Sequence, residues 1–167
     1  RTGQEELING ILAGHDVLGI MPTGAGKSLC YQLPALMLKG ITLVISPLIS
    51  LMSDQVKALN QAGVHAAYIN SSLTENQIRM ALSYASQGRY KIIYVAPERL
   101  NTPRFLDFAC NADISMLTVD EAHCISQWGQ DFRPSYLEIA GFLTRLPRRP
   151  IVSAFTATAT ELSLIHI

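Results

Sequence analysis

The sequence has few cysteines, no long apolar run and no excess of charge of either sign, and each shortage excludes a class of protein. Its three cysteines, Cys30, Cys110 and Cys124, are odd in number and widely spaced, which fits neither a disulfide framework nor a zinc site. We therefore expect a reducing, cytoplasmic setting. No apolar run reaches the length of a membrane span and no secretion signal is recognisable, so we expect no membrane association.

The charge balance is also uninformative for the chain as a whole. Thirteen basic and thirteen acidic residues cancel, so any nucleic-acid site must be local rather than a property of the whole surface. The four histidines are too scattered along the chain to predict a metal cluster. What is present is a length of 167 residues with 49% hydrophobic residues, which is enough for one domain with a sizeable core.

Short β-rich runs alternate with helical patterns along the chain. The predicted strands are residues 16–21, 41–46, 65–69, 91–95, 115–119 and 151–155. The predicted helices are residues 4–13, 27–38, 50–62, 74–87 and roughly 134–146. This alternation predicts an α/β fold, with a central parallel sheet covered by helices on both faces. Ligands of such sheets bind beyond the carboxyl ends of the strands, where Pro22, Pro47, Pro97, Asp120 and Thr156 stand.

A glycine-rich turn, Pro-Thr-Gly-Ala-Gly-Lys-Ser at residues 22–28, lies between a predicted strand and a predicted helix. Backbone N–H groups of such a turn and the helix N-terminus attract phosphates, Lys27 adds a mobile cation, and Ser28 is a candidate Mg²⁺ ligand. The strict P-loop pattern has glycine where this chain has Met21, so an ordinary strand-to-helix loop is the alternative. The residues predicted to bind ATP here are Thr23, Gly24, Ala25, Gly26, Lys27 and Ser28.

Two adjacent carboxylates, Asp120 and Glu121, follow the apolar run at residues 116–119. The pair suits a division of labour in which Asp120 holds Mg²⁺ and Glu121 orients and deprotonates the water that attacks the γ-phosphate. We expect Glu121 and Lys27 to be the catalytic residues. Adjacent acids at a strand end could alternatively be a helix-capping pair.

Together these segments resemble motifs I, II and III of superfamily 2 helicases, carried by residues 22–28, residues 120–123 and Thr156-Ala157-Thr158. Ser46-Pro47-Leu48 and Ala96-Pro97-Glu98-Arg99-Leu100 resemble motifs Ia and Ib, which face single-stranded nucleic acid in that superfamily. The resemblance implies a RecA-like P-loop lobe. It assigns DNA contact or coupling to Ser46, Pro47, Pro97, Glu98, Arg99, Thr156 and Thr158, with the threonines hydrogen-bonding toward the carboxylates of residues 120–123. The Thr-Ala alternation is also good strand sequence.

Residues 123–136, HCISQWGQDFRPSY, resemble the aromatic-rich loop of the RecQ DNA helicases. In this loop Trp128 and Phe132 can stack on unpaired bases and Arg133 can meet a phosphate, although both aromatics could instead anchor the loop in the core. Gln130 stands where that family commonly has histidine. Arg1 and Gln4 resemble the end of the family's motif 0, which contacts the adenine.

The resemblance implies a function: ATP hydrolysis coupled to 3′-to-5′ unwinding of DNA in repair and recombination. ATP and Mg²⁺ are the implied cofactors, and the implied partners are single-stranded and partly duplex DNA and a second RecA-like lobe. The implied location is a bacterial cytoplasm, at the nucleoid when on DNA. The alternatives are a DEAD/DEAH-type RNA helicase lobe and a non-enzymatic, ATP-gated DNA-binding module.

The predicted domain is residues 1–161. The last six residues, Leu-Ser-Leu-Ile-His-Ile, are interpreted as a non-native tail, with a genuine apolar helix start as the alternative. Because helicases of this type close the ATP site with arginines from a second lobe, we expect residues 1–161 alone to bind Mg-ATP weakly and to hydrolyse it poorly.

Overall fold

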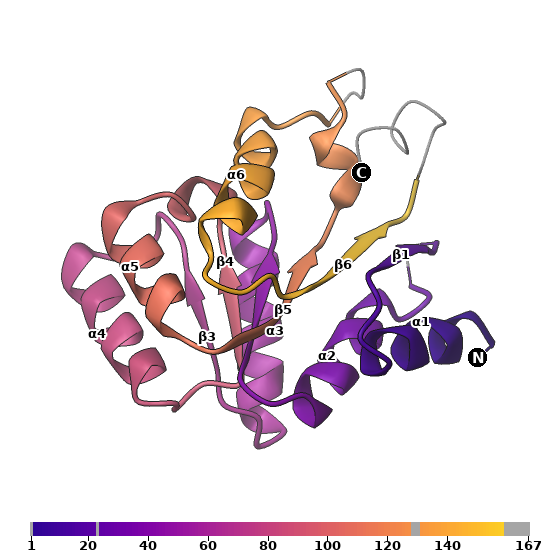
Figure 1. Ribbon diagram of the computed structural model, residues 1–167, viewed down its shortest axis with the longest axis horizontal. Coiled ribbons are helices and arrows are strands. Elements are labelled where there is room, and N and C mark those ends of the chain that lie inside the picture. Colours follow the sequence, from indigo (N-terminus) through magenta and orange to yellow (C-terminus); the bar gives the residue numbers. More distant parts are fainter. Residues whose placement is uncertain (1, 23, 128–130, 159–167) are drawn as a thin grey trace.

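A computed structural model describes residues 2–22, 24–127 and 131–158 of the chain. The described part forms a six-stranded parallel sheet in the order β1-β6-β5-β2-β4-β3, with helices on both faces (Figure 1). The predicted α/β architecture is therefore confirmed. The predicted boundary after residue 161 lies outside the described residues and stays a prediction.

The strands follow the apolar runs of the sequence closely. They are β1 (Val17–Ile20), β2 (Ile41–Ile45), β3 (Ala66–Ile69), β4 (Ile92–Val95), β5 (Ile114–Val119) and β6 (Ile151–Thr156). The α-helices are α1 (Thr2–Leu12), α2 (Lys27–Met37), α3 (Ile49–Gln61), α4 (Glu75–Ser86), α5 (Pro103–Asn111) and α6 (Glu138–Arg145). None of the described helices is long and apolar enough to cross a membrane.

The central strands are apolar on both sides because each side meets a layer of helices. On β2, Leu43 and Ile45 pack with the buried residues of α4, α5 and α6, whereas Val44 packs with those of α1, α2 and α3. Tyr94 of β4 and Phe155 of β6 share the second core. The two cores explain why the strands read as continuous apolar runs rather than as alternating ones.

Two local predictions need correction. The helix α5 was not predicted, although Pro103 at its first turn and buried Phe105, Phe108 and Ala109 have helical spacing. The single helix predicted at residues 134–146 is instead a short 3₁₀ turn, η3 (Pro134–Leu137), followed by α6. The other predicted elements end within two residues of the observed bounds.

The edge strand β1 is placed against β6 by close packing at Gly19. A Cβ atom on Gly19 would lie 2.6 Å from the ring of Phe155, so only glycine lets the two strands approach in this register. Beyond the end of β1, the amide of Met21 donates to the carbonyl of Thr156 at 2.9 Å. The glycine-rich turn therefore begins beside the end of β6, at the carboxyl edge of the sheet.

Candidate active site

The glycine-rich turn has the left-handed backbone that its glycines allow. Gly24 and Gly26 have φ angles of 82° and 80°, and Gly26 is the N-cap of α2. The amide of Ala25 donates to the carbonyl of Pro22 at 3.1 Å, which closes the turn. Thr23, predicted to bind nucleotide, lies outside the described residues.

Gln4 of α1 contacts this turn directly. Its side-chain nitrogen donates to the carbonyl of Ala25 at 2.8 Å and more weakly to that of Gly26 at 3.4 Å. The contact brings the predicted adenine-binding residue to the phosphate loop, 21 positions away in sequence. Arg1, the other residue assigned to the adenine, lies outside the described residues.

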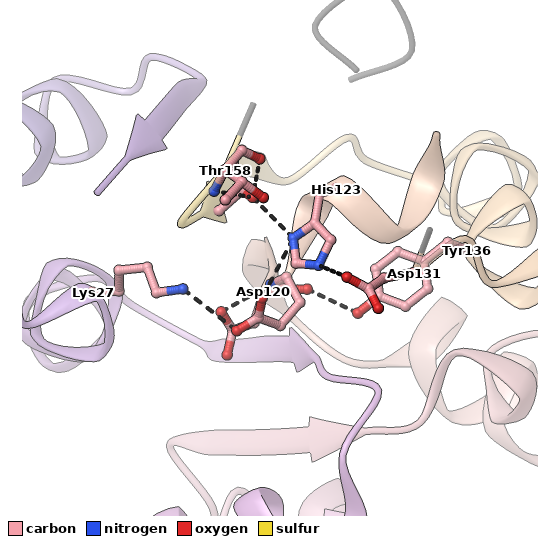
Figure 2. Close-up of polar contacts among 8 residues, drawn as sticks. Lys27, Asp120, His123, Asp131, Tyr136 and Thr158 are labelled. Carbon is pink, nitrogen blue, oxygen red and sulfur yellow. Dashed lines mark hydrogen bonds and ion pairs between the residues drawn. The ribbon is translucent and has the colours of Figure 1, made fainter. Parts of the chain in front are cut away.

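Lys27 and Ser28 stand in the first turn of α2, and Lys27 reaches the acidic end of β5. The Nζ atom of Lys27 lies 3.4 Å from Oε1 of Glu121, and the two side chains are 15% and 24% exposed (Figure 2). Residues separated by 94 positions thus form an ion pair. The distance is long for a charge-assisted hydrogen bond, which leaves Lys27 able to exchange Glu121 for another anion.

Asp120 is almost fully buried at the end of β5, with 7% of its surface exposed. Its backbone is held on both sides, because its amide donates to Ile45 at 2.9 Å and its carbonyl accepts from the Tyr136 hydroxyl at 2.8 Å. Burial raises the pKa of its carboxyl, and the neighbouring Glu121 charge raises it further, against the lowering effect of Lys27. A cation beside this carboxylate would relieve both costs.

Glu121 has an unusual backbone, with φ of 51° and ψ of 47°. It is the only non-glycine residue with positive φ among the described residues, and its amide donates to Oδ1 of Asp120 at 2.9 Å. This left-handed conformation costs an L-residue about 1–2 kcal/mol. Such strain is typical of functional sites, and here it turns the chain sharply so that Asp120 and Glu121 are both retained at one strand end.

His123 is the centre of a polar cluster that joins the acidic strand end to β6 (Figure 2). Its Nδ1 atom lies 2.9 Å from Oγ1 of Thr156 and 3.4 Å from Oε2 of Glu121. Oγ1 of Thr156 in turn donates to the carbonyl of Thr158 at 2.7 Å. The predicted threonine contact is therefore real but needs correction: Thr156 meets the imidazole rather than a carboxylate, and Thr158 meets Thr156.

The aromatic-rich segment returns to the same cluster through Asp131. Its Oδ2 atom lies 3.7 Å from Nε2 of His123, a contact that sequence reasoning missed. Phe132 is half-buried and Arg133 is exposed, with its amide donating to the carbonyl of Cys124 at 2.9 Å. Trp128 and Gln130 lie outside the described residues, so the roles given to Trp128, Phe132 and Arg133 stay predictions.

The segments predicted to face DNA follow β2 and β4 at the same edge of the sheet. Ser46 and Pro97 are buried, and the DNA-contact or coupling role assigned to them stays a prediction. Pro47 is half-buried and Glu98 is exposed. Arg99 pairs with Glu75 of α4 at 3.7 Å. The DNA contacts assigned to Pro47, Glu98 and Arg99 stay predictions.

The fold brings together groups that are distant in sequence: a phosphate-type loop with its lysine, two carboxylates, and a histidine linked to two further segments. A family model described as DEAD/DEAH box helicase matches residues 1–165. Among solved structures, the fold is similar to the Hef helicase domain of Pyrococcus furiosus, with a TM-score of 0.73, 21% identity, and coverage of 98% of this chain and 34% of that one. It is also similar to a hypothetical ATP-dependent RNA helicase from Sulfolobus tokodaii, with a TM-score of 0.74, 21% identity, and coverage of 97% and 47%.

Sequence relatives agree with the resemblance drawn from residues 123–136. The chain is 51% identical over 161 residues to the ATP-dependent DNA helicase RecQ of Bacillus subtilis, covering 96% of this chain and 27% of that protein. It is 50% identical over 159 residues to RecQ of Haemophilus influenzae, covering 95% and 26%. This identity confirms the resemblance to the RecQ helicases. The chain spans about a quarter of the length of these curated relatives. With its fold, its site and its sequence in agreement, the chain belongs to the DEAD/DEAH box helicase family.

Proposed function

We propose that this chain is the ATP-binding lobe of a RecQ-like DNA helicase, which couples ATP hydrolysis to 3′-to-5′ unwinding of DNA in repair and recombination. The observation that carries the proposal is the meeting of Lys27 with Glu121, beside buried Asp120. A loop lysine and two carboxylates at one strand end are the parts that phosphoryl transfer to water requires. The identity to RecQ proteins supports DNA as the nucleic acid.

The residues present fit a divalent cation. Asp120 is a buried carboxylate whose pKa is raised by burial and by the Glu121 charge, so a cation would stabilise its ionised form. Ser28 stands in the first turn of α2, next to Lys27, and offers a hydroxyl oxygen. Oxygen ligands of this kind suit Mg²⁺, which neutralises phosphate charge when bound. Asp120 and Ser28 are the residues that would hold it.

The protein's own groups have separate tasks in hydrolysis. The turn at Gly24 and Gly26 directs backbone N–H groups at the phosphates, and the α2 N-terminus adds its partial positive charge. Lys27 leaves Glu121 for the phosphates when nucleotide binds. Glu121, released from Lys27, then orients the attacking water and accepts its proton. In the ligand-free lobe the Lys27–Glu121 pair keeps both groups at the site.

DNA binding reaches this site through the His123 cluster. His123 contacts Glu121 and Thr156, and Asp131 connects it to the segment in which Trp128, Phe132 and Arg133 are proposed to meet DNA. A shift of that segment on single-stranded DNA would therefore move the partner of the catalytic carboxylate. We also propose that a second lobe supplies the arginines that complete the ATP site, and that the protein works in the cytoplasm.

The test compares nucleic acids as stimulants of ATP hydrolysis by the complete helicase. We expect single-stranded DNA to stimulate turnover strongly and single-stranded RNA of the same sequence to stimulate it far less. The 167-residue chain alone should bind Mg-ATP weakly. It should hydrolyse ATP at least about 10³-fold more slowly than the complete helicase, because it lacks the second-lobe arginines. Equal stimulation by RNA would favour the RNA helicase alternative, and ATP binding without any hydrolysis in the complete protein would favour the non-enzymatic one.

A further inference from the structure

A hydrogen-bond network joins α2, β4 and α3, with two buried tyrosines at its centre. Tyr31 of α2 and Tyr94 of β4 are each 1% exposed, and their hydroxyl oxygens lie 3.1 Å apart. The side-chain nitrogen Nε2 of Gln32 donates to the Tyr94 hydroxyl at 3.0 Å and to Oε1 of Gln55 on α3 at 2.9 Å. We call these four residues the Tyr–Gln chain. None of them belongs to the site described above.

The position of the Tyr–Gln chain is its first informative property. The helix α2 begins with Lys27, directly after the phosphate loop. The strand β4 leads into the 3₁₀ turn Pro97–Arg99, and α3 begins just after Pro47. The four side chains thus connect the nucleotide-facing helix to both of the segments that are predicted to face DNA after β2 and β4.

The chemistry of the Tyr–Gln chain is its second informative property. Buried hydroxyls lose their hydration, and each must be paired to avoid a penalty, whereas phenylalanine and leucine of similar volume would pack without one. Burial raises the pKa of both tyrosines, so both remain neutral hydroxyls that can donate as well as accept. Directional bonds between elements fix their relative orientation, which apolar packing does less well.

We propose that Tyr94 is a positioning residue that couples nucleotide binding at α2 to DNA binding at the segments after β2 and β4. This coupling role rests on the proposed function and deepens it. Tyr94 is hydrogen-bonded to Tyr31 and Gln32, which both belong to α2. Gln32 in turn is hydrogen-bonded to Gln55 of α3. If nucleotide binding shifts the amino end of α2, these hydrogen bonds are kept only when β4 and α3 move with α2. Tyr94 touches no reacting atom, so its loss affects coupling and not the chemical step.

The experiment is Tyr94→Phe in the complete helicase, with ATP turnover measured with and without single-stranded DNA. We expect the DNA-free rate to stay within about twofold and the stimulation by DNA to fall roughly three- to tenfold. The matched control is Tyr68→Phe. Tyr68 is the register partner of Tyr94 on β3, is only partly buried, and makes no side-chain hydrogen bond among the described residues. Its stimulation should equal that of the wild type.

A double variant, Tyr31→Phe with Tyr94→Phe, separates coupling from packing. It removes both buried hydroxyls and leaves neither unpaired, so its melting temperature should recover most of what Tyr94→Phe loses. We expect its stimulation by DNA to stay low. A double variant that regains stimulation together with stability would overturn the inference. If the wild type is stimulated and Tyr94→Phe equals it, only the coupling role fails; a wild type that DNA does not stimulate refutes the proposed function and the coupling role with it.

Discussion

The two edges of the parallel sheet hold their charges in different ways. At the amino ends of the strands, Arg149 donates two hydrogen bonds of 3.1 and 2.7 Å to Asp16, and Arg148 donates one of 2.6 Å to Asp113. At the carboxyl ends, Nζ of Lys27 lies 3.4 Å from Oε1 of Glu121, and Nε2 of His123 lies 3.7 Å from Oδ2 of Asp131. Both short pairs are exposed. In the long pairs Lys27, Glu121 and His123 are largely sheltered, whereas Asp131 is exposed.

The pKa directions show the same contrast. Arg149 holds the pKa of Asp16 below its ordinary value, whereas burial and Glu121 raise the pKa of Asp120. Strain follows the same division, since the left-handed backbone of Glu121 lies at the carboxyl edge. The amino edge is satisfied as it stands. The carboxyl edge keeps a buried carboxylate of raised pKa and a strained backbone, features that are typical of functional sites.

The largest effect should come from Glu121→Gln, which removes the base and keeps the shape of the carboxyl edge. We expect turnover of the complete helicase to fall by about 10²–10⁴, the usual contribution of a positioned base. Nucleotide affinity should be kept or improved, because Lys27 is no longer paired with a carboxylate. Steady-state hydrolysis and the fluorescence of a labelled nucleotide measure the two quantities. Turnover near the wild-type rate would remove Glu121 from its catalytic role.

Two glycine-to-alanine changes test whether backbone strain matters equally at the two edges. Gly26 and Gly63 have φ angles of 80° and 85°, so alanine costs each site about 1–2 kcal/mol. Only at Gly26 does the new Cβ meet a neighbour, the side-chain nitrogen of Gln4 at 2.5 Å. We expect Gly26→Ala to weaken nucleotide binding about tenfold or more and Gly63→Ala to leave it unchanged.

Calorimetric titration of nucleotide into both variants, with their melting temperatures, decides the matter. Equal losses of affinity would mean that general destabilisation, rather than the phosphate loop, explains the effect of Gly26→Ala. The control is well matched, because nothing lies within 4 Å of the Cβ position at Gly63, directly after α3.

Sequence reasoning found those parts of the carboxyl edge that are local. Lys27 and Ser28 follow a glycine-rich turn, and Asp120 and Glu121 follow an apolar run, so short segments suffice to predict them. The strands were predictable because each is one apolar run between helical patterns. The helix α5, of 9 residues, was missed although its buried positions have helical spacing.

The parts that sequence reasoning missed depend on register and topology. The resemblance placed Thr156 near residues 120–123 but not against the His123 imidazole, its partner because β6 pairs with β5. Asp131 lies beside His123 in the fold, a contact that no local spacing pattern predicts. The left-handed backbone of Glu121 is likewise invisible, since nothing in a glutamate predicts positive φ.

Asp120→Asn should stabilise the ligand-free lobe at neutral pH. The raised pKa means that the native state binds more protons than the unfolded one, so wild-type stability falls as pH rises from about 3.8 through the native pKa. Asparagine does not ionise and can still accept from the Glu121 amide. We expect a melting temperature roughly 2–4 °C higher at pH 7, as for about 1 kcal/mol. The gain should vanish near pH 3.8, and the added stability from Mg-nucleotide should be lost.

Asp16→Asn is the smallest of these effects and has the opposite sign. Because Arg149 lowers the pKa of Asp16, its contribution to stability is present above its unfolded pKa and is lost as pH falls through the native value. The side chains of Asp16 and Arg149 are 47% and 60% exposed, so the pair contributes at most about 1 kcal/mol and is screened by salt. We expect Asp16→Asn to lower the melting temperature slightly at pH 7, less so in high salt, without changing nucleotide affinity. If Asp16→Asn and Asp120→Asn both stabilised the protein, both edges of the sheet would carry unsatisfied charge. The contrast drawn between the amino edge and the carboxyl edge would then be wrong.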